Sequence, residues 1–221
     1  MEWTSVPVHM IDFEGCSRSG IVEYGVVTLV DGRIENSVNR LCRSVGPIWT
    51  EDTRVHGLTR GDLADRAPFS DEWTLFSGLR ATGVLAAHFS GTEKRLLRSV
   101  WPYPRTSRDF IGGRGSATDW GPWIDTGRLV IEFRPDLPTA GLEDVVESLG
   151  LSSEVDRLAD QHCPKGRDHF HCAPYDALAA ALVLKALAYD GSGHPLSLQR
   201  LAEESTADPE KRDALQQGRL F

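Results

Sequence analysis

The stretch HMIDFEG, residues 9–15, places two carboxylates beside an apolar run near the start of the chain. The segment around it, VPVHMIDF, is short, apolar and led by Pro7, which is typical of a β-strand. Alternate side chains of a strand share a face, so Asp12 and Glu14 should point the same way and repel one another. A divalent cation between them would relieve that repulsion. The alternative is that both acids lie in water at a strand end.

The segments that follow predict a sheet that begins as a meander. Two further strands, 21–30 and 34–43, are joined by an Asp-Gly turn at 31–33. A compact buried strand is predicted at 83–89. The segment WIDTGRLVIEF, residues 123–133, is predicted as a strand that enters another element.

Helices are predicted between and after these strands. The clearest covers 173–190, where Pro174 suits the first turn and the interior is rich in Ala and Leu. A Gly-, Pro- and Ser-rich loop is predicted at 102–122. Strands followed by mixed strands and helices indicate an α/β or α+β domain with a mixed sheet. The other predicted helices are 70–81, 90–101, 140–151 and 153–161.

Composition limits the class of protein. The chain has 221 residues with 40% hydrophobic content, enough for one well-cored domain. It has no apolar run of membrane-spanning length and no basic-then-apolar leader, so we expect neither membrane insertion nor a signal peptide. The net charge of −8 argues against a general nucleic-acid coat protein but not against a metal-dependent enzyme. Four irregularly spaced cysteines predict reduced thiols and a cytoplasmic protein.

Three further residues could complete a metal site. Glu93 follows the predicted strand at 83–89 and lies in the first turn of the next helix, although Ser90-x-x-Glu93 is also a capping-box pattern. Asp176 lies in the first turn of the helix at 173–190, where its charge also suits the helix dipole. His171 lies in the loop just before that helix, where an imidazole could take a proton from water.

Taken together, these segments resemble the DEDDh 3′–5′ exonucleases, the DnaQ-like family. The first motif is IDFEG, and the second is AHFSGTEKRLL, in which His88 and Glu93 keep the family spacing. The third is HCAPYDALAAA, which matches His-x-Ala-x-x-Asp. The segments RVHGLT, IDT and LEDVVESLGL also resemble family segments, so the match covers roughly residues 5–190. The chain departs from the family at Glu93, where Asp is commoner, and at Phe89, where the family has Asn.

The resemblance implies an RNase H-like α/β fold, with a five-stranded mixed sheet that has one antiparallel strand and is flanked by helices. Residues 1–190 would form the exonuclease domain, and residues 191–221 a C-terminal helix and polar tail. The implied products are nucleoside 5′-monophosphates, released from single-stranded 3′ ends with DNA favoured over RNA.

The resemblance also implies a site. Two Mg²⁺ or Mn²⁺ ions would activate water and stabilise the leaving 3′ oxygen, with His171 as general base. Asp12, Glu14 and Asp176 would hold the ions, and Glu93 would help through water. The residues expected to contact the terminal nucleotide are Phe13, Gly15, Cys16 and His88.

Two other classes of protein stay open at this point, besides an exoribonuclease. One is a non-catalytic nucleic-acid-binding relative. The other is a zinc-binding module, although the spacing of its candidate ligands matches no common zinc pattern. Those ligands are His162, Cys163, His169, His171 and Cys172.

The end of the chain carries a second resemblance. Gln217, Leu220 and Phe221 form a Gln-x-x-Leu-Phe sequence, which resembles the peptide that docks bacterial replication and repair proteins on the sliding clamp. The alternative is that the terminal Leu-Phe pair folds back onto the domain to leave water.

Overall fold

The computed structural model describes residues 1–112, 115–206 and 208. The predicted clamp-binding residues, Gln217, Leu220 and Phe221, lie outside the described residues. Within the described part, no helix is long and apolar enough to cross a membrane, and all four cysteines are free.

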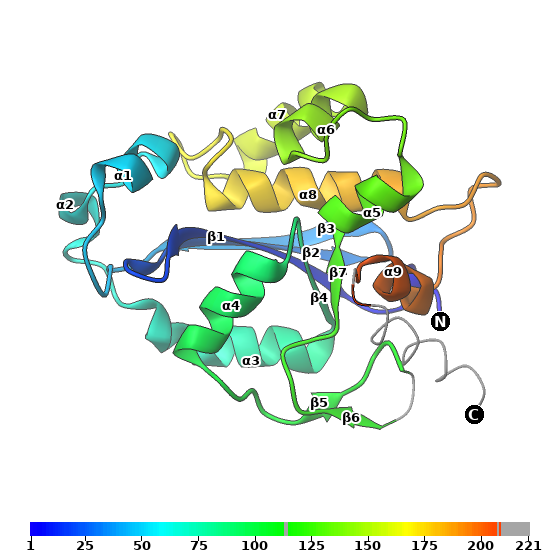
Figure 1. The fold of residues 1–221 in the computed structure, drawn as a ribbon, viewed down its shortest axis with the longest axis horizontal. Coiled ribbons are helices and arrows are strands. Elements are labelled where there is room, and N and C mark those ends of the chain that lie inside the picture. The colour runs from blue at the N-terminus through cyan, green and yellow to red at the C-terminus, as the bar shows by residue number, and fades with distance from the viewer. Residues whose placement is uncertain (113–114, 207, 209–221) are drawn as a thin grey trace.

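A five-stranded mixed sheet forms the centre of the molecule (Figure 1). The strands occur in the order β3-β2-β1-β4-β7. β2 is antiparallel to both β1 and β3, whereas β4 and β7 run parallel to β1. The predicted fold class, with one antiparallel strand and a three-stranded meander, is therefore confirmed. The strands are β1 (Val8–Cys16), β2 (Gly20–Val30), β3 (Arg33–Leu41), β4 (Val84–Ala87) and β7 (Trp123–Asp125).

Helices cover both faces of this sheet. α8 (Ala173–Leu187) lies along β1 and β2 on one face, with α5 (Thr126–Phe133), α6 (Leu142–Ser148) and α7 (Ser152–His162) around it (Figure 1). On the other face lie α3 (Trp73–Thr82) and α4 (Gly91–Val100). The remaining elements are α1 (Thr50–His56), α2 (Arg60–Leu63), α9 (Leu198–Glu204), the short strands β5 (Ser107–Arg108) and β6 (Ser116–Ala117), and two 3₁₀ turns, Trp3–Ser5 and Phe69–Glu72.

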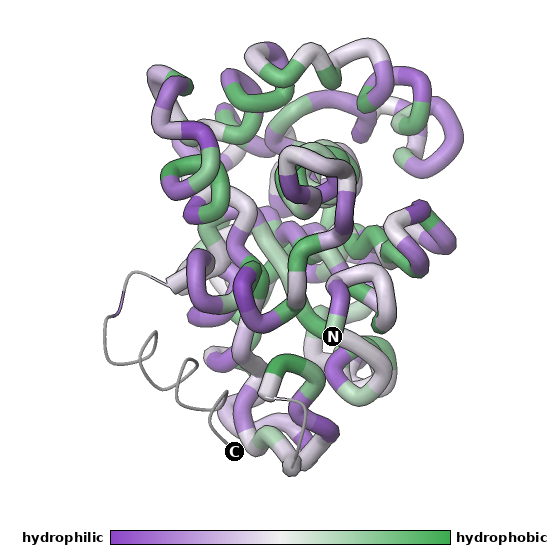
Figure 2. The backbone as a smooth tube through the Cα atoms, turned by 90° about the vertical axis from the view of Figure 1, so that its right-hand side faces the viewer, coloured by the Kyte–Doolittle hydropathy of each residue, from purple (hydrophilic) through white to green (hydrophobic). Residues whose placement is uncertain are grey.

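The two helical layers bury two different cores. α8 is apolar nearly all round and packs on aliphatic side chains such as Met10 and Val27. The opposite core is aromatic and includes Phe13, Phe69 and Phe76. Figure 2 shows hydrophobic residues concentrated at the centre and hydrophilic ones at the periphery. Because strand side chains alternate, Phe13 faces the aromatic core and leaves its neighbours Asp12 and Glu14 on the α8 side.

Two glycines allow the site to form. Gly15 follows a β-bulge in β1 and has φ 125°, and a Cβ there would lie 2.1 Å from the Gly20 carbonyl oxygen. Gly25 lies opposite Asp12 in the ladder, and a Cβ on it would lie 2.2 Å from the carbonyl oxygen of Ala173. The absence of side chains therefore lets the start of α8 approach the strands.

Residues 123–133 form a strand that enters another element, as predicted, and that element is a helix. Strand β7 ends at Asp125, and residues 126–133 form helix α5. The Asp125 side chain accepts the Arg128 N–H and caps the helix. Leu129 and Val130 are then buried in the core on the α8 side of the sheet. The short β5–β6 ladder lies within the segment that we predicted as a loop.

The beginning of the chain pairs with the segment around α9. The Trp3 N–H donates to the Leu196 carbonyl, and the Leu198 N–H donates to the Met1 carbonyl, at 3.0 Å each. Leu198 and Leu201 of α9 are buried in the same core as α8. The domain boundary predicted near residue 190 stays a prediction, although residues 198–202 pack against the sheet domain.

Candidate metal centre

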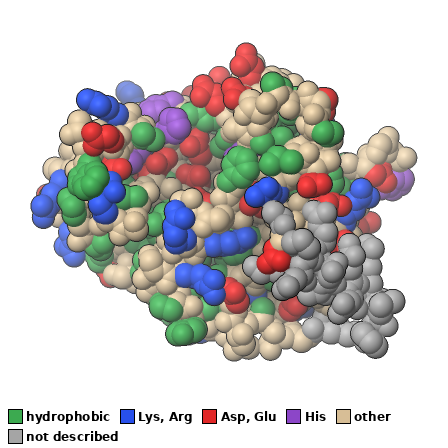
Figure 3. Space-filling view, in the orientation of Figure 1, with side chains coloured by type: hydrophobic (Ala, Val, Ile, Leu, Met, Phe, Trp, Pro, Cys, Tyr) green, Lys and Arg blue, Asp and Glu red, His purple; other side chains and the backbone are tan. Residues whose placement is uncertain are grey.

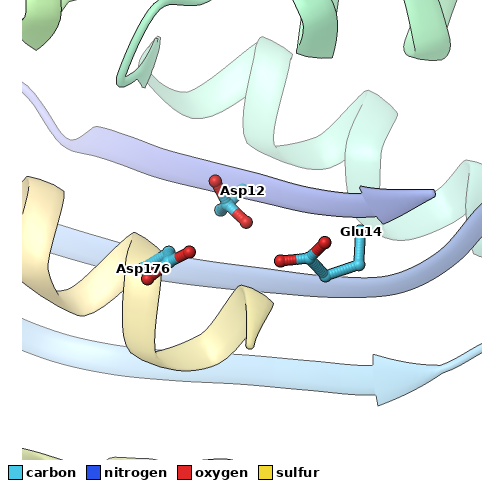
Figure 4. Close-up of side chains that lie close together, drawn as sticks. All are labelled: Asp12, Glu14 and Asp176. Atoms are coloured by element: carbon cyan, nitrogen blue, oxygen red, sulfur yellow. The ribbon is translucent and has the colours of Figure 1, made fainter. Parts of the chain in front are cut away.

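Three carboxylates converge where β1 meets the start of α8. Asp12, Glu14 and Asp176 each offer an oxygen, and these oxygens lie within 4.8 Å of one another. Asp12 and Glu14 come from one face of β1, and Asp176 points toward them from the first turn of α8 (Figure 4). The structure therefore brings together residues that are 164 positions apart in the sequence.

The electrostatics of this cluster favour a bound cation. Burial and the neighbouring Glu23 raise the pKa of Asp12 to about 7. Burial together with Asp12 and Asp176 raises the pKa of Glu14 to about 10, and the pKa of Asp176 is raised by burial and by Asp12. Raised pKa values mean that the ionised carboxylates are destabilised, which a nearby positive charge reverses.

Glu93 lies at the same site and is not a helix cap. The Ser90 side chain makes no capping hydrogen bond to α4, and its backbone N–H donates to Asp125 Oδ2 at 2.8 Å instead of to Glu93. The Glu93 side chain is 5% exposed, and burial and Asp12 raise its pKa. The capping-box alternative is therefore wrong, and Glu93 is a fourth buried acid, close enough to Asp12 for the two charges to interact.

The donor set fits hard divalent cations such as Mg²⁺ or Mn²⁺. Asp176 Oδ1 and Glu93 Oε2 are buried without a hydrogen-bond partner. Buried carboxylate oxygens seldom stay unpartnered, and oxygen ligands are those that such cations prefer. The four acids are thus suited to hold metal.

His171 lies directly beside this cluster in the chain. Its backbone N–H donates to Asp176 Oδ2 at 3.1 Å, and its side chain is exposed. Its φ of 62° is left-handed, a conformation that costs a non-glycine residue about 1–2 kcal/mol. Such strained residues cluster at functional sites, which supports the prediction for His171.

The four residues predicted to contact the nucleotide differ in how accessible their side chains are. The Phe13 ring packs in the aromatic core, with its centroid 5.4 Å from that of Phe69. Only the backbone of Phe13 is therefore available to a nucleotide. Gly15 and Cys16 lie beyond Glu14, at the bulged end of β1. His88 is bound within the protein, with Nδ1 2.9 Å from Thr126 Oγ1 and Nε2 2.8 Å from the Ala140 carbonyl oxygen. A substrate contact through either His88 nitrogen would require these bonds to break.

Asp125 holds the loop between β4 and α4. Its carboxylate accepts the backbone N–H groups of Phe89 and Ser90, and its own N–H donates to Ser205 Oγ at 2.8 Å. Phe89, which replaces the family's Asn, has φ 53° and leaves 41% of its surface exposed. Asp125 thereby fixes the loop from which Glu93 enters the site.

The sequence did not reveal a buried ion pair next to the acids. Glu23 is 2% exposed and accepts from Arg167 Nε at 2.9 Å, from Arg167 Nη2 at 2.5 Å and from the Ala173 N–H at 2.9 Å. Arg167 Nη1 also donates to the His56 carbonyl at 2.8 Å. The pair joins β2, the end of α1 and the loop that carries His171. An acid inside the apolar run IVEYGVV is the one sequence signal that could have indicated it.

The alternative zinc cluster does not form in the described part of the chain. Only the acidic group there brings three potential metal-ligating side chains within range of one ion. His162 Nδ1 lies 3.0 Å from Ser37 Oγ instead, and Cys172 Sγ lies 3.5 Å from the ring nitrogens of His169.

Comparison with known proteins agrees with this geometry. The chain matches no established family profile. It is 25% identical over 178 residues to exodeoxyribonuclease 10 of Escherichia coli K12, covering 80% of this chain and 66% of that protein. It is 26% identical over 132 residues to the PolC-type DNA polymerase III of Thermotoga petrophila, covering 59% of this chain and 9% of that protein. The chain therefore spans just under two thirds of the first relative and a small part of the second.

Solved structures give the fold. Exonuclease X in complex with 5′ overhanging duplex DNA superimposes with a TM-score of 0.57 at 19% identity, over 88% of this chain and 99% of that one. The nuclease domain of 3′hExo, a DEDDh family member bound to rAMP, gives a TM-score of 0.55 at 16% identity, over 81% and 90%. This chain has the DEDDh exonuclease fold. The resemblance drawn from the motifs is thereby confirmed at the level of the fold.

Proposed function

We propose that this chain is a metal-dependent 3′–5′ exonuclease that releases nucleoside 5′-monophosphates from single-stranded ends. The observation that carries the proposal is the convergence of Asp12, Glu14 and Asp176 within 4.8 Å, with Glu93 buried against the same cluster. The fold shared with exonuclease structures supports it. A non-catalytic relative would not need four buried acids that repel one another.

The roles of the residues follow from their places. Asp12, Glu14 and Asp176 would hold two Mg²⁺ or Mn²⁺ ions, with Glu93 acting through water. When bound, such ions lower the pKa of water and stabilise charge on the leaving oxygen. His171 would take the proton of the attacking water, and the bond from its N–H to Asp176 keeps this residue beside the acids.

DNA is the favoured substrate. The relative with the longest alignment reported above is named an exodeoxyribonuclease, and exonuclease X was solved with DNA. RNA is the second candidate, because the 3′hExo nuclease domain binds rAMP on the same fold. The choice depends on contacts to the 2′-hydroxyl.

An assay on end-blocked oligonucleotides tests the proposal. With Mg²⁺ or Mn²⁺, a 5′-blocked single strand should shorten from its 3′ end, whereas a 3′-blocked strand should stay intact. A chelator should stop the reaction, and a matched RNA strand should shorten more slowly than DNA. Equal loss of the 3′-blocked and 5′-blocked strands would refute a 3′–5′ exonuclease.

Replacing His171 tests the general base. His171→Ala should lower kcat by roughly 10²–10⁴-fold while metal binding is retained, since the imidazole transfers a proton and is not a proposed ligand. His169→Ala is the matched control, and a larger effect there would show that the motif is misaligned by two residues.

Three predictions from the sequence extend this proposal. Docking of Gln217, Leu220 and Phe221 on a bacterial sliding clamp would hold the enzyme near DNA ends by raising its effective concentration. A cytoplasmic location and a role in DNA repair would suit such a protein. All three stay predictions.

A further inference from the structure

Helix α4 carries charges of opposite sign on different faces. Glu93, in its first turn, is buried toward the acid cluster, and Leu96 and Leu97 are buried in the aromatic core. Three basic side chains lie on the outer side, where residues three and four positions apart share a face. We call this surface the α4 basic face; it consists of Lys94, Arg95 and Arg98.

The α4 basic face adjoins the acid cluster on one side of the molecule. Figure 3 shows Lys and Arg side chains gathered over α4, directly below the acidic side chains at the centre. Arg98 lies five residues beyond Glu93, which is roughly 7.5 Å along the helix axis. A chain of phosphates leaving the acid cluster in this direction would meet these cations next.

Two charges on this face are available to a polyanion. Arg95 and Arg98 are exposed. Arg98 pairs with Asp119 at 3.6 Å, but both side chains are 58% exposed, and such pairs contribute little and are screened by salt. The chain as a whole carries a net charge of −8. Binding of a nucleic acid therefore requires a local positive surface to offset the general repulsion.

We propose that the α4 basic face binds the backbone phosphates of the substrate strand, just upstream of the nucleotide held at the acid cluster. The proposal rests on the exonuclease function but concerns binding, not the chemical step. Contacts to phosphates fix the position of a strand without reading its sequence. The face would thus hold oligonucleotides of any sequence and contribute nothing to a substrate that has a single phosphate.

Salt dependence of binding measures these contacts directly. The probe is a fluorescent 15-nucleotide thymidine oligomer titrated in Ca²⁺ at several KCl concentrations. The triple variant Lys94→Gln, Arg95→Gln, Arg98→Gln should reduce the slope of log K against log [salt] by about 2, since each lost phosphate contact on a single strand contributes about 0.7. The single variant Arg95→Gln should reduce it by about 0.7. An unchanged slope in both variants would overturn the proposal.

The control removes the same charge elsewhere. Arg33→Gln, Arg157→Gln, Lys185→Gln replaces cations outside α4 and the acid cluster, and it should leave the slope unchanged. An equal fall in slope would show a general charge effect and refute a specific face. A fall seen only with duplex DNA carrying a 5′ overhang would assign the face to the complementary strand, contrary to the proposal.

A small substrate separates this proposal from the exonuclease function. The triple variant should hydrolyse the p-nitrophenyl ester of thymidine 5′-monophosphate within about twofold of the wild-type rate, because that ester has no upstream phosphate. If the wild type cleaves neither this ester nor the oligomers, the exonuclease proposal fails. The salt dependence of oligomer binding still tests the binding proposal in that case. An equal loss on the ester and the oligomer would contradict upstream binding.

Discussion

Asp12→Asn abolishes exonuclease turnover and, in metal-free protein at pH 8, raises the unfolding temperature. Activity is expected to fall by roughly 10³-fold or more, the upper range for loss of one preorganised charge-stabilising group. Stability rises because the pKa of Asp12 is raised to about 7 by burial and by Glu23, so its ionised form is destabilised in the folded state. Each unit of such a shift corresponds to about 1.4 kcal/mol.

The pH dependence gives the sign of this effect. The folded protein binds the Asp12 proton more tightly than the unfolded chain, where a carboxyl titrates near about 4. Binding of this proton therefore adds most to the free energy of unfolding in acid, and the contribution is lost as the pH rises from about 4 to about 7. The gain from Asp12→Asn should appear at pH 8 and vanish at pH 4, as measured by thermal unfolding in a chelator.

Adding Mg²⁺ and testing a matched surface variant provide the controls for that experiment. Mg²⁺ should stabilise the wild type, since it binds only the folded site, and should stabilise Asp12→Asn less. Asp160→Asn makes the same change on the exposed surface of α7 and should leave activity and stability near the wild-type values. An active Asp12→Asn enzyme would remove Asp12 from the metal site.

Arg167→Ala destabilises the fold by about 3–5 kcal/mol, the usual cost of removing one partner of a buried ion pair. Glu23 is 2% exposed and would keep only the hydrogen bond from the Ala173 N–H, because the other two bonds to its carboxylate come from Arg167. For a protein of this size each kcal/mol lowers the unfolding temperature by about 2–4 °C. The measurement is thermal or denaturant unfolding of the purified protein.

Two comparison variants separate a buried pair from a general arginine effect. Arg134→Ala breaks the pair with Asp136 at 2.8 Å, in which the Asp136 side chain is 61% exposed, and should cost far less stability than Arg167→Ala. The double variant Glu23→Gln, Arg167→Ala should recover part of the loss, because no buried charge is then left unpaired. A cost for Arg167→Ala no larger than that for Arg134→Ala would contradict this account.

The strands and the acids were predictable because their signals are local. The apolar runs at 8–16 and 20–30 and the Asp-Gly turn predict the meander, and alternation places Asp12 and Glu14 on one face. Asp176 was predictable from its place in the first turn of a strongly helical segment. By contrast, residues 123–133 have apolar spacing that a strand or a helix can satisfy, and the cap formed by Asp125 decides between them.

Interactions between distant segments were not predictable. Glu23 and Arg167 are 144 residues apart, and their pairing depends on how the loop before α8 meets β2. The same holds for Asp125, whose bonds to Phe89, Ser90 and Ser205 join three segments. His88 matched a motif by spacing, but only the structure shows that both its ring nitrogens are already engaged.

The first residues of the chain pair with the segment around the start of α9, and this determines where a fused polypeptide would leave the fold. Met1 and Trp3 are held by backbone hydrogen bonds to Leu198 and Leu196, at the end of the molecule away from the carboxyl end of β1 (Figure 1). A foreign polypeptide joined ahead of Met1 would therefore leave from the side remote from the acid cluster. The fold is thus suited to tethering, to a surface or to another polypeptide, with the acid cluster on the side left open to solution.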